Sequence, residues 1–259
     1  MAVPVEYTGR SDPGRTVELL WGTRATATRG PKPGLTVDRI VNAAIAIADA
    51  EGIEALSMRR VAEELGAGAM SLYRHVPGKA ELLDLMVDRV CGETARPRRR
   101  AGAWRKRLEQ VARANRELFE RHPWLAQVST LHPPLGPGVL AKYEYELGSV
   151  EGIGLTDVEM DSVVSLVVGY AGAAVGAALD AERVRARPGQ TDDDWRNALA
   201  PFLEQVFDAA RYPLAARVGV TATEHYQGAY DPAHAFEFGL QRVLDGIEVL
   251  VDRRRASWP

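Results

Sequence analysis

Apolar residues recur three and four positions apart along most of the chain, which is the spacing of one buried face of an α-helix. Between residues 36 and 52 this spacing is regular, with Thr36 placed to cap the first turn and Gly52 placed to end the helix. Alternating stretches of the kind that form strands are scarce. The pattern therefore predicts an all-α protein, with helices over about 36–52, 57–65, 69–75, 79–90, 104–121, 139–150, 157–185, 192–209 and 235–254.

Two of these predicted helices are short and are separated by a turn that contains glycine. Ser57 is placed to cap the first helix, and Gly66 ends it because glycine adopts the left-handed cap conformation at little cost. The second helix, over 69–75, is stopped by Pro77 and Gly78. Such a pair can lay its second helix in the major groove of DNA, although an ordinary helical bundle can contain the same hairpin.

The segments around this pair resemble a known family. Residues 52–66, GIEALSMRRVAEELG, and residues 72–83, LYRHVPGKAELL, are similar to the signature of the tetracycline-repressor (TetR) family of one-component transcriptional regulators. The resemblance implies an N-terminal three-helix, helix-turn-helix DNA-binding domain, followed by a helical-bundle domain that binds a ligand and dimerises. Residues 236–248 resemble, more weakly, the last helix of the tetracycline-repressor branch.

This resemblance divides the chain into three parts. We expect a flexible basic arm over residues 1–34, a helix-turn-helix DNA-binding domain over 35–92, and a ligand-binding and dimerisation domain over 93–259. With 259 residues, of which 46% are hydrophobic, the chain can bury a core in each domain. A net charge of −3 does not exclude a DNA partner, because basic residues need only cluster locally.

Composition gives no indication of export or of a membrane. The first residues, MAVPVE, lack the basic region and apolar core of a secretion signal, and we expect no uncharged apolar run long enough to span a bilayer. Cys91 is the single cysteine, which excludes an internal disulfide. We therefore expect a cytoplasmic protein without a membrane partner.

The resemblance also implies roles for residues of the head. Arg59 and Tyr73 match base- or groove-contacting positions, while Ala69 and Met70 occupy the exposed start of the recognition helix. Since neither Ala69 nor Met70 can make paired hydrogen bonds to a base, discrimination is expected to rest on Arg59, the arm and DNA shape. Tyr73 has a second interpretation as a packing aromatic. The positions that match phosphate contacts are Ser57, His75 and Lys79.

A stiff basic stretch, RGPKPG at residues 29–34, ends the arm. Arg29 and Lys32 are spaced along a slender backbone that is suited to following a minor groove. A disordered leader with incidental charges explains the same composition. Whether the arm contacts DNA is left open by the sequence.

The expected effector cavity has an apolar, aromatic wall with few polar groups, which suits a hydrophobic or planar small molecule. In the tetracycline repressor a histidine on the long helix reaches a drug-bound magnesium ion, and the matching position here is Tyr170, which argues against tetracycline–magnesium as the inducer. Each wall residue has the alternative of being ordinary core. The expected lining is Trp104, Leu108, Val111, Asn115, Trp124, His132, Tyr143 and Tyr170.

Two of the predicted helices have the pattern of a dimer interface. Apolar residues in the last helix, 235–254, alternate four and three positions apart. In the long helix, 157–185, glycines leave one face without large side chains. Close packing inside one subunit is the alternative. A twofold dimer would present two recognition helices about 34–36 Å apart to a pseudo-palindrome. The expected interface residues are Gly169, Gly172, Gly176, Phe236, Leu240, Val243, Ile247 and Leu250.

Catalytic signatures are missing from the sequence: it contains no GxSxG, HExxH or P-loop pattern, and no dinucleotide fingerprint after a strand. We expect no cofactor and no metal site, because His122 and His132 have few carboxylate or cysteine residues near them in the sequence. The sequence thus predicts a homodimeric repressor, released from a double-stranded DNA operator by a small-molecule effector. The alternatives are an activator, an effector-independent architectural DNA-binding protein and, remotely, an all-helical enzyme.

Overall fold

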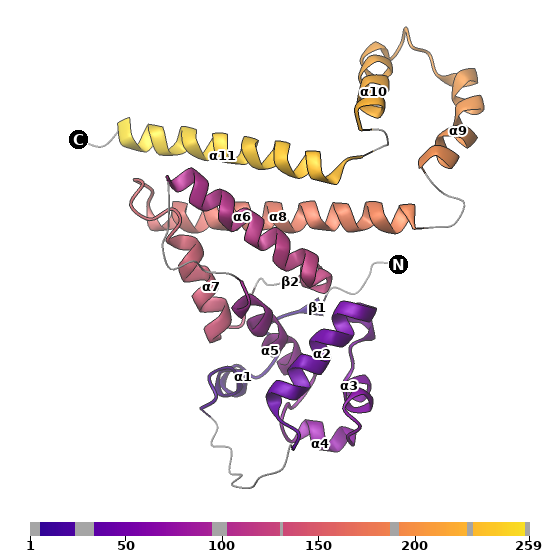
Figure 1. Ribbon diagram of the computed structural model, residues 1–259. Helices are drawn as coiled ribbons and strands as arrows, with labels where there is room; N and C mark the ends of the chain where they lie inside the picture. The colour runs from indigo at the N-terminus through magenta and orange to yellow at the C-terminus, as the bar shows by residue number, and fades with distance from the viewer. Residues whose placement is uncertain are drawn as a thin grey trace.

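The computed structural model describes residues 6–23, 34–94, 103–129, 132–186, 192–226 and 230–256. Over these ranges the chain is helical except for two two-residue strands and short turns, which confirms the prediction of an all-α fold. Residues 34–92 form a small head and residues 103–256 a larger body, one above the other in Figure 1.

The head consists of a three-helix unit and the helix that leaves it. Its elements are α2 (Val37–Glu51), the 3₁₀ turn η1 (Ile53–Ala55), α3 (Met58–Glu64), α4 (Ala69–Tyr73) and α5 (Lys79–Gly92). Thr36 caps α2 by accepting from the Arg39 backbone N–H at 3.2 Å, as the sequence predicts. Helix α4 is shorter than expected, ending at Tyr73 rather than at His75.

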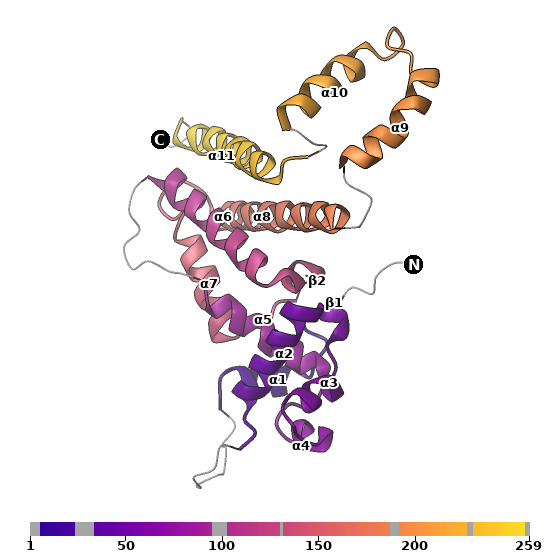
Figure 2. The same ribbon diagram turned by 45° about the vertical axis from the view of Figure 1, so that its right-hand side comes forward.

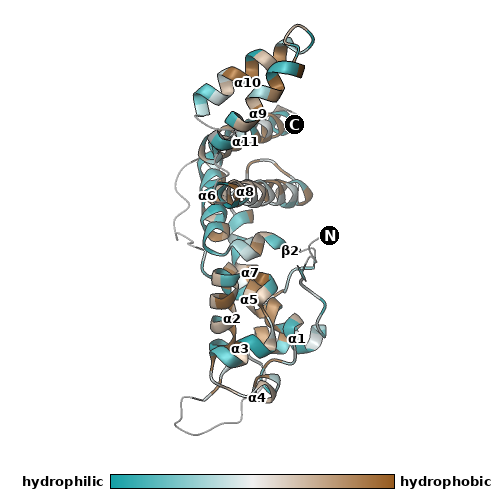
Figure 3. Cartoon of the chain, turned by 90° about the vertical axis from the view of Figure 1, so that its right-hand side faces the viewer, coloured by the Kyte–Doolittle hydropathy of each residue, from teal (hydrophilic) through white to brown (hydrophobic). Residues whose placement is uncertain are grey.

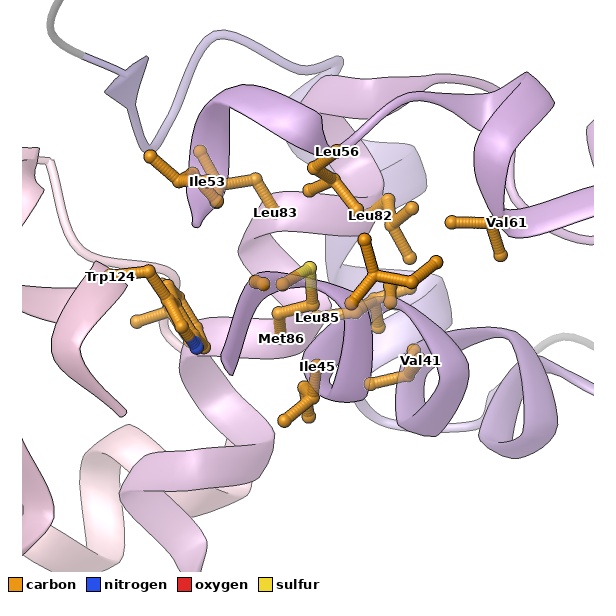
Figure 4. Packing of buried hydrophobic residues seen from close by; sticks show 14 of the residues in the cluster. Val41, Ile45, Ile53, Leu56, Val61, Leu82, Leu83, Leu85, Met86 and Trp124 are labelled. Carbon is orange, nitrogen blue, oxygen red and sulfur yellow. The ribbon is translucent and has the colours of Figure 1, made fainter. Parts of the chain in front are cut away.

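The core of the head continues into the body. Val41, Leu82 and Met86, all nearly fully buried, pack together between α2 and α5. Figure 4 shows the Trp124 ring from the body beside Met86 in the same cluster. A continuous core means that the head is not free to turn independently of the segment that carries Trp124.

Three long helices build the body, and shorter elements connect it to the head (Figure 1). Helix α8 packs along α6 and α11, and α7 packs on α5 of the head. The residues of the α6–α8–α11 core include Leu108, Val167 and Leu240, each fully buried. The elements are α6 (Trp104–Arg121), the 3₁₀ turn η2 (Pro123–Gln127), β2 (Val128–Ser129), α7 (Pro137–Leu147), α8 (Asp157–Arg185) and α11 (Pro232–Ala256).

Helices α9 (Asp192–Val206) and α10 (Pro213–Tyr226) stand away from α8 and α11 in Figures 1 and 2. The sequence predicts α9, with an end three residues later, but not α10. Apolar side chains on both helices are exposed in the single chain, among them Phe202 at 67% and Leu214 at 67%. Brown segments on α10 show this apolar character in Figure 3.

The expectation of a flexible arm over residues 1–34 is wrong for residues 6–23. Strand β1 (Glu6–Tyr7) pairs in parallel with β2, and α1 (Pro13–Leu20) packs on α5. The Thr8 hydroxyl donates to the His132 carbonyl at 2.8 Å, and the Ser11 hydroxyl donates to Asp84 at 2.6 Å. These partners lie far away in the sequence, which is why local composition did not reveal them. Arg29 and Lys32 lie outside the described residues.

Helix α8 corrects a second expectation. Residues 162–179 contain no charged side chain, and α8 is long and apolar enough to cross a membrane by length and composition. In the fold, Val163, Val167 and Ala171 are buried against neighbouring helices. Helices α6 and α11 thus cover one side of α8, whereas 28% of the apolar stretch is buried and Leu166 is 53% exposed in the single chain.

Candidate DNA-reading head and effector cavity

The pair α3 and α4 is held in the geometry that the sequence predicts. The Ser57 hydroxyl accepts from the Arg60 backbone N–H at 3.1 Å, and Gly66 has a φ of +61° in the turn. Val61 and Leu72 are fully buried between the two helices and the rest of the head. Local capping and two apolar contacts thus orient α4, which lies at the end of the head remote from the body (Figure 1).

The outer surface of this pair is available to a partner. Arg59 has a side chain that is 87% exposed and donates to Glu63 at 2.9 Å, one turn later on α3. On α4, Met70 is 77% exposed and Tyr73 is 43% exposed. Ala69 differs from expectation, since it is partly buried and packs against the core of the head. The exposed surface therefore combines the Arg59 guanidinium, the flexible Met70 side chain and the flat Tyr73 ring.

The three expected phosphate-contacting residues differ in their surroundings. Ser57 is exposed and already caps α3, and His75 is half-buried. Lys79 begins α5 and donates to the carboxylate of Glu6 at 2.7 Å, with both side chains about one-third exposed. The ion pair was not expected from the sequence, because 73 residues separate the two groups.

Two adjoining cavities of about 430 and 640 Å³ lie where the body meets α5. Together they are bounded by α5, α6, η2, α7 and α8, and by the loop before α7. Five residues line both, so the two spaces share a wall. These residues are Val87, Cys91, Lys142, Val168 and Gly169.

Among the eight expected lining residues, Asn115 lines the smaller cavity and Tyr143 the larger. The Tyr143 hydroxyl donates to Asp161 at 2.8 Å, and this hydrogen bond raises the pKa of Tyr143. Trp124 lines a separate hollow between α2, η2 and the far part of α8. The His132 carbonyl accepts from Thr8, and the residue lines neither of these two cavities.

Trp104, Leu108, Val111 and Tyr170 correct the expected lining. The first three face the α6–α8–α11 core. The Tyr170 hydroxyl donates to the Phe236 carbonyl at 2.8 Å, while its ring stacks on that of Phe236. Helix α6 has two buried sides, and its apolar stripe does not distinguish the side against a cavity from the side against another helix. The sequence analysis missed Val87 and Lys142, because only the docking of α5 and α7 brings them to the cavity.

A polar cluster interrupts the apolar wall of the cavities. The Lys142 ammonium and the Asn115 amide both donate to one oxygen of Glu146, Oε1, at 2.6 and 2.7 Å. The side chains of Lys142 and Glu146 are 12% and 5% exposed, so this ion pair is largely shielded from water. Within the described chain, no group of three His, Cys, Asp or Glu side chains is arranged to hold a metal ion.

The expected dimer seam also needs correction. Phe236, Leu240 and Ile247 are at most 4% exposed and belong to the core of their own subunit. Val243 and Leu250 are partly buried against the same core, and Gly172 faces the ring of Phe119. A three-and-four spacing identifies a packed face without identifying its partner. Gly169 is exposed and Gly176 half-buried, and a Cβ at either position would meet open space.

Other apolar side chains occupy the outer faces of these two helices. Leu166 on α8 is 53% exposed, and Phe238 and Val249 on α11 are 57% and 49% exposed. On the single chain these side chains remain in contact with solvent. The outer face of α8 and α11, defined by these three residues, is called the outer apolar face below.

Comparison with known proteins agrees with this architecture. Residues 40–86 match the model described as "Bacterial regulatory proteins, tetR family", and residues 96–251 match "Tetracyclin repressor-like, C-terminal domain". The transcriptional repressor DrrR1 of Streptomyces coeruleorubidus is 47% identical over 253 residues, which cover 97% of this chain and 92% of that protein. The repressor Rv1353c of Mycobacterium tuberculosis is 28% identical over 240 residues, covering 90% and 86%.

Solved structures lead to the same group. Apo ActR from Streptomyces coelicolor has a TM-score of 0.67 at 30% identity, covering 84% of this chain and 98% of that chain. ActR in complex with actinorhodin has a TM-score of 0.68 at 31% identity, covering 83% and 96%. A helix-turn-helix head joined to a helical body with a cavity defines the class of ligand-responsive, DNA-binding transcriptional regulators. This chain belongs to the tetR family of that class, and it is not an enzyme.

Proposed function

We propose that this protein is a homodimeric, cytoplasmic repressor that leaves a pseudo-palindromic operator when a small apolar or aromatic molecule enters the body. The relative DrrR1 is named a repressor, and ActR has been solved with actinorhodin and with (S)-DNPA. The observation that carries the proposal is the position of α5. This helix contributes Val87 and Cys91 to both cavities and begins with Lys79 in the head.

A ligand in the cavities therefore touches the same rigid element that begins in the DNA-reading head. Eight residues separate Lys79 from Val87, which is about 12 Å along a helix axis. Because α5 packs on α2 as well as on α7, a shift of its cavity end is passed to the head. A ligand that favours the shifted arrangement over the DNA-bound one by about 1–3 kcal/mol is sufficient for regulation.

On DNA, the proposed roles follow the exposure of the head. Arg59 reaches a base edge after leaving Glu63, and Met70 and Tyr73 contact the groove. Phosphate contacts are proposed for Ser57 and Lys79, together with His75, Arg29 and Lys32. Ala69, the first residue of α4, packs against the core of the head and makes at most an apolar contact with a thymine methyl group.

The second copy is proposed to cover the outer apolar face. Leu166, Phe238 and Val249 lie there in contact with solvent, whereas the seam that the sequence suggested is buried in its own subunit. Burying these side chains against a twofold partner removes apolar surface from water and sets the distance between two heads. Sedimentation velocity of Phe238→Glu against the wild type tests this, with a shift toward monomer expected.

The DNA-binding proposal is tested by a fluorescence-anisotropy titration, at several salt concentrations, with duplex from beside the protein's own gene. The Arg59→Ala/Tyr73→Ala variant is compared with Arg217→Ala, which removes an exposed arginine of α10. We expect selective binding that falls about 10-fold or more in the first variant, since one base-contacting arginine alone contributes about 1–3 kcal/mol. Equal binding to scrambled duplex, unchanged in either variant, would contradict the assigned surface.

A further inference from the structure

The polar cluster in the cavity wall specifies the chemistry of the effector. This inference rests on the proposed effector site. We infer that the cavities bind a flat, mostly apolar molecule that carries an acidic oxygen next to a hydroxyl group. Lys142 binds the acidic oxygen, and the carbonyl oxygen of the Asn115 side chain accepts from the hydroxyl.

Asn115 supplies the first argument. This residue is 1% exposed, and its amide nitrogen donates to the Val111 carbonyl at 3.0 Å and to Glu146 Oε1 at 2.7 Å. Both partners are acceptors, so the orientation of the amide is determined and its oxygen faces neither of them. That oxygen, Oδ1, is buried without a hydrogen-bond partner. An unpaired buried acceptor beside a cavity is a place for a ligand donor, because pairing it removes a cost that the empty site bears.

Lys142 supplies the second argument. Its ammonium group has three N–H donors, and the hydrogen bond found for it goes to Glu146 Oε1 at 2.6 Å. The residue lines both cavities, and its side chain is 12% exposed. An anionic oxygen that enters from either cavity can take a further N–H of Lys142 without breaking the pair with Glu146. In this poorly hydrated place a charge-assisted hydrogen bond is strong.

The two proposed ligand-binding residues, Lys142 and Asn115, are called the anchors below, and they are neighbours in the cavity wall. Both Lys142 and Asn115 donate to the same atom, Glu146 Oε1, so the two side chains lie next to each other in the cavity wall. We therefore place the acidic oxygen and the hydroxyl of the ligand close together on its ring system. Elsewhere the wall of the larger cavity contains three more polar side chains, Tyr143, Asp161 and Ser165, of which the first two are hydrogen-bonded to each other. The apolar residues that accept a flat hydrocarbon body are Val87, Leu118, Phe119, Val128, Val164 and Val168.

Three naphthalene compounds test this with the full-length protein. The compound 3-hydroxy-2-naphthoate has both groups, 3-methoxy-2-naphthoate lacks the donor, and methyl 3-hydroxy-2-naphthoate lacks the charge. Isothermal titration calorimetry is expected to give the first compound a Kd at least 10-fold lower than either of the others. Equal affinity for all three, or no binding of the first at millimolar concentration, overturns the inference.

Variants assign the preference to the two anchors. Asn115→Leu is expected to erase the difference between the hydroxy and methoxy compounds. The double variant Lys142→Met/Glu146→Gln removes both charges of the ion pair together, and it is expected to erase the difference between the acid and its ester. Lys106→Met makes the same change on the exposed side of α6 and is expected to keep both differences. Retention of both differences in the cavity variants overturns the assignment, and thermal melting verifies that each variant is folded.

Effector control of DNA binding and the assignment of the two anchors can be contradicted independently of each other. If the three compounds bind with the expected order but 3-hydroxy-2-naphthoate does not release the protein from its operator, the anchors are supported and effector control is contradicted. If an unrelated apolar compound releases the operator while the naphthalene series shows no preference, effector control stands and the anchors are overturned.

Discussion

Lys79, the first residue of the helix that leaves the DNA-reading head, donates to Glu6 of the N-terminal strand at 2.7 Å. A lysine proposed to contact a phosphate is thus paired with a carboxylate of the same chain. Through β1, the carboxylate is also connected to β2 in the body. Under the phosphate-binding role proposed for Lys79, DNA binding competes with a contact that joins the head, the N-terminal segment and the body.

Removing this carboxylate is expected to strengthen DNA binding. In Glu6→Gln, Lys79 no longer has to leave an anion before it meets a phosphate. A partly exposed ion pair contributes up to about 1 kcal/mol, so the operator Kd should fall about two- to five-fold. Glu18→Gln makes the same charge change on the exposed side of α1 and controls for net charge. An equal gain in both variants, measured by anisotropy, would show a general charge effect rather than release of Lys79.

The junction of head and body depends on Asp49, whose Oδ1 accepts from the Trp124 indole at 2.7 Å and contacts the His122 ring at 2.8 Å. Trp124→Phe keeps a buried ring and removes one donor to a carboxylate, so the free energy of unfolding should fall by about 1–3 kcal/mol. Trp21→Phe provides the comparison, because the Trp21 indole donates to the Leu135 carbonyl from an exposed position. Urea titrations with equal midpoints for both variants would argue against a structural role for this junction.

Helices α5 and α7 approach closely because Gly138 has no side chain. A Cβ at Gly138 would overlap the backbone carbonyl of Asp88, so Gly138→Ala forces the helices apart. Overpacking of this kind should lower the free energy of unfolding by about 1–3 kcal/mol. Gly219→Ala on α10 meets open space and should raise it by up to about 1 kcal/mol. Chemical denaturation measures both, and a loss of the same size at Gly219 would refute the close-approach explanation.

The start of α8 should respond to acid. The Arg254 guanidinium and the Thr156 cap lower the pKa of Glu159 to about 2 from 4.5. The folded state thus holds this carboxylate charged more strongly than the unfolded chain does, and its contribution to stability is present above pH 4.5 and is lost as the pH falls toward 2. Glu159→Gln should therefore melt at a lower temperature than the wild type at pH 7, and the gap should close near pH 2–3. Melting curves in a pH series test this, and a constant gap would contradict it.

The all-helical fold and the reading pair were predictable because their determinants are local. The Ser57 cap and the positive φ of Gly66 depend on hydrogen bonds and sterics within one turn. The family resemblance lies in the same continuous segment, so a role of Arg59 and Tyr73 in contacting DNA could also be proposed from the sequence. In all these cases neighbouring residues carry the whole signal.

Tertiary structure decided what depends on a partner far away in the chain. The 3.6-residue period shows that α6 and α11 each have a buried face, but Phe236 meets its own subunit and Asn115 meets a cavity only because of how the helices dock. The N-terminal segment is held in place by partners such as Asp84, 73 residues from Ser11. Helix formation is set by bonds between residues four apart, whereas the identity of the surface that covers each helix is set by long-range packing.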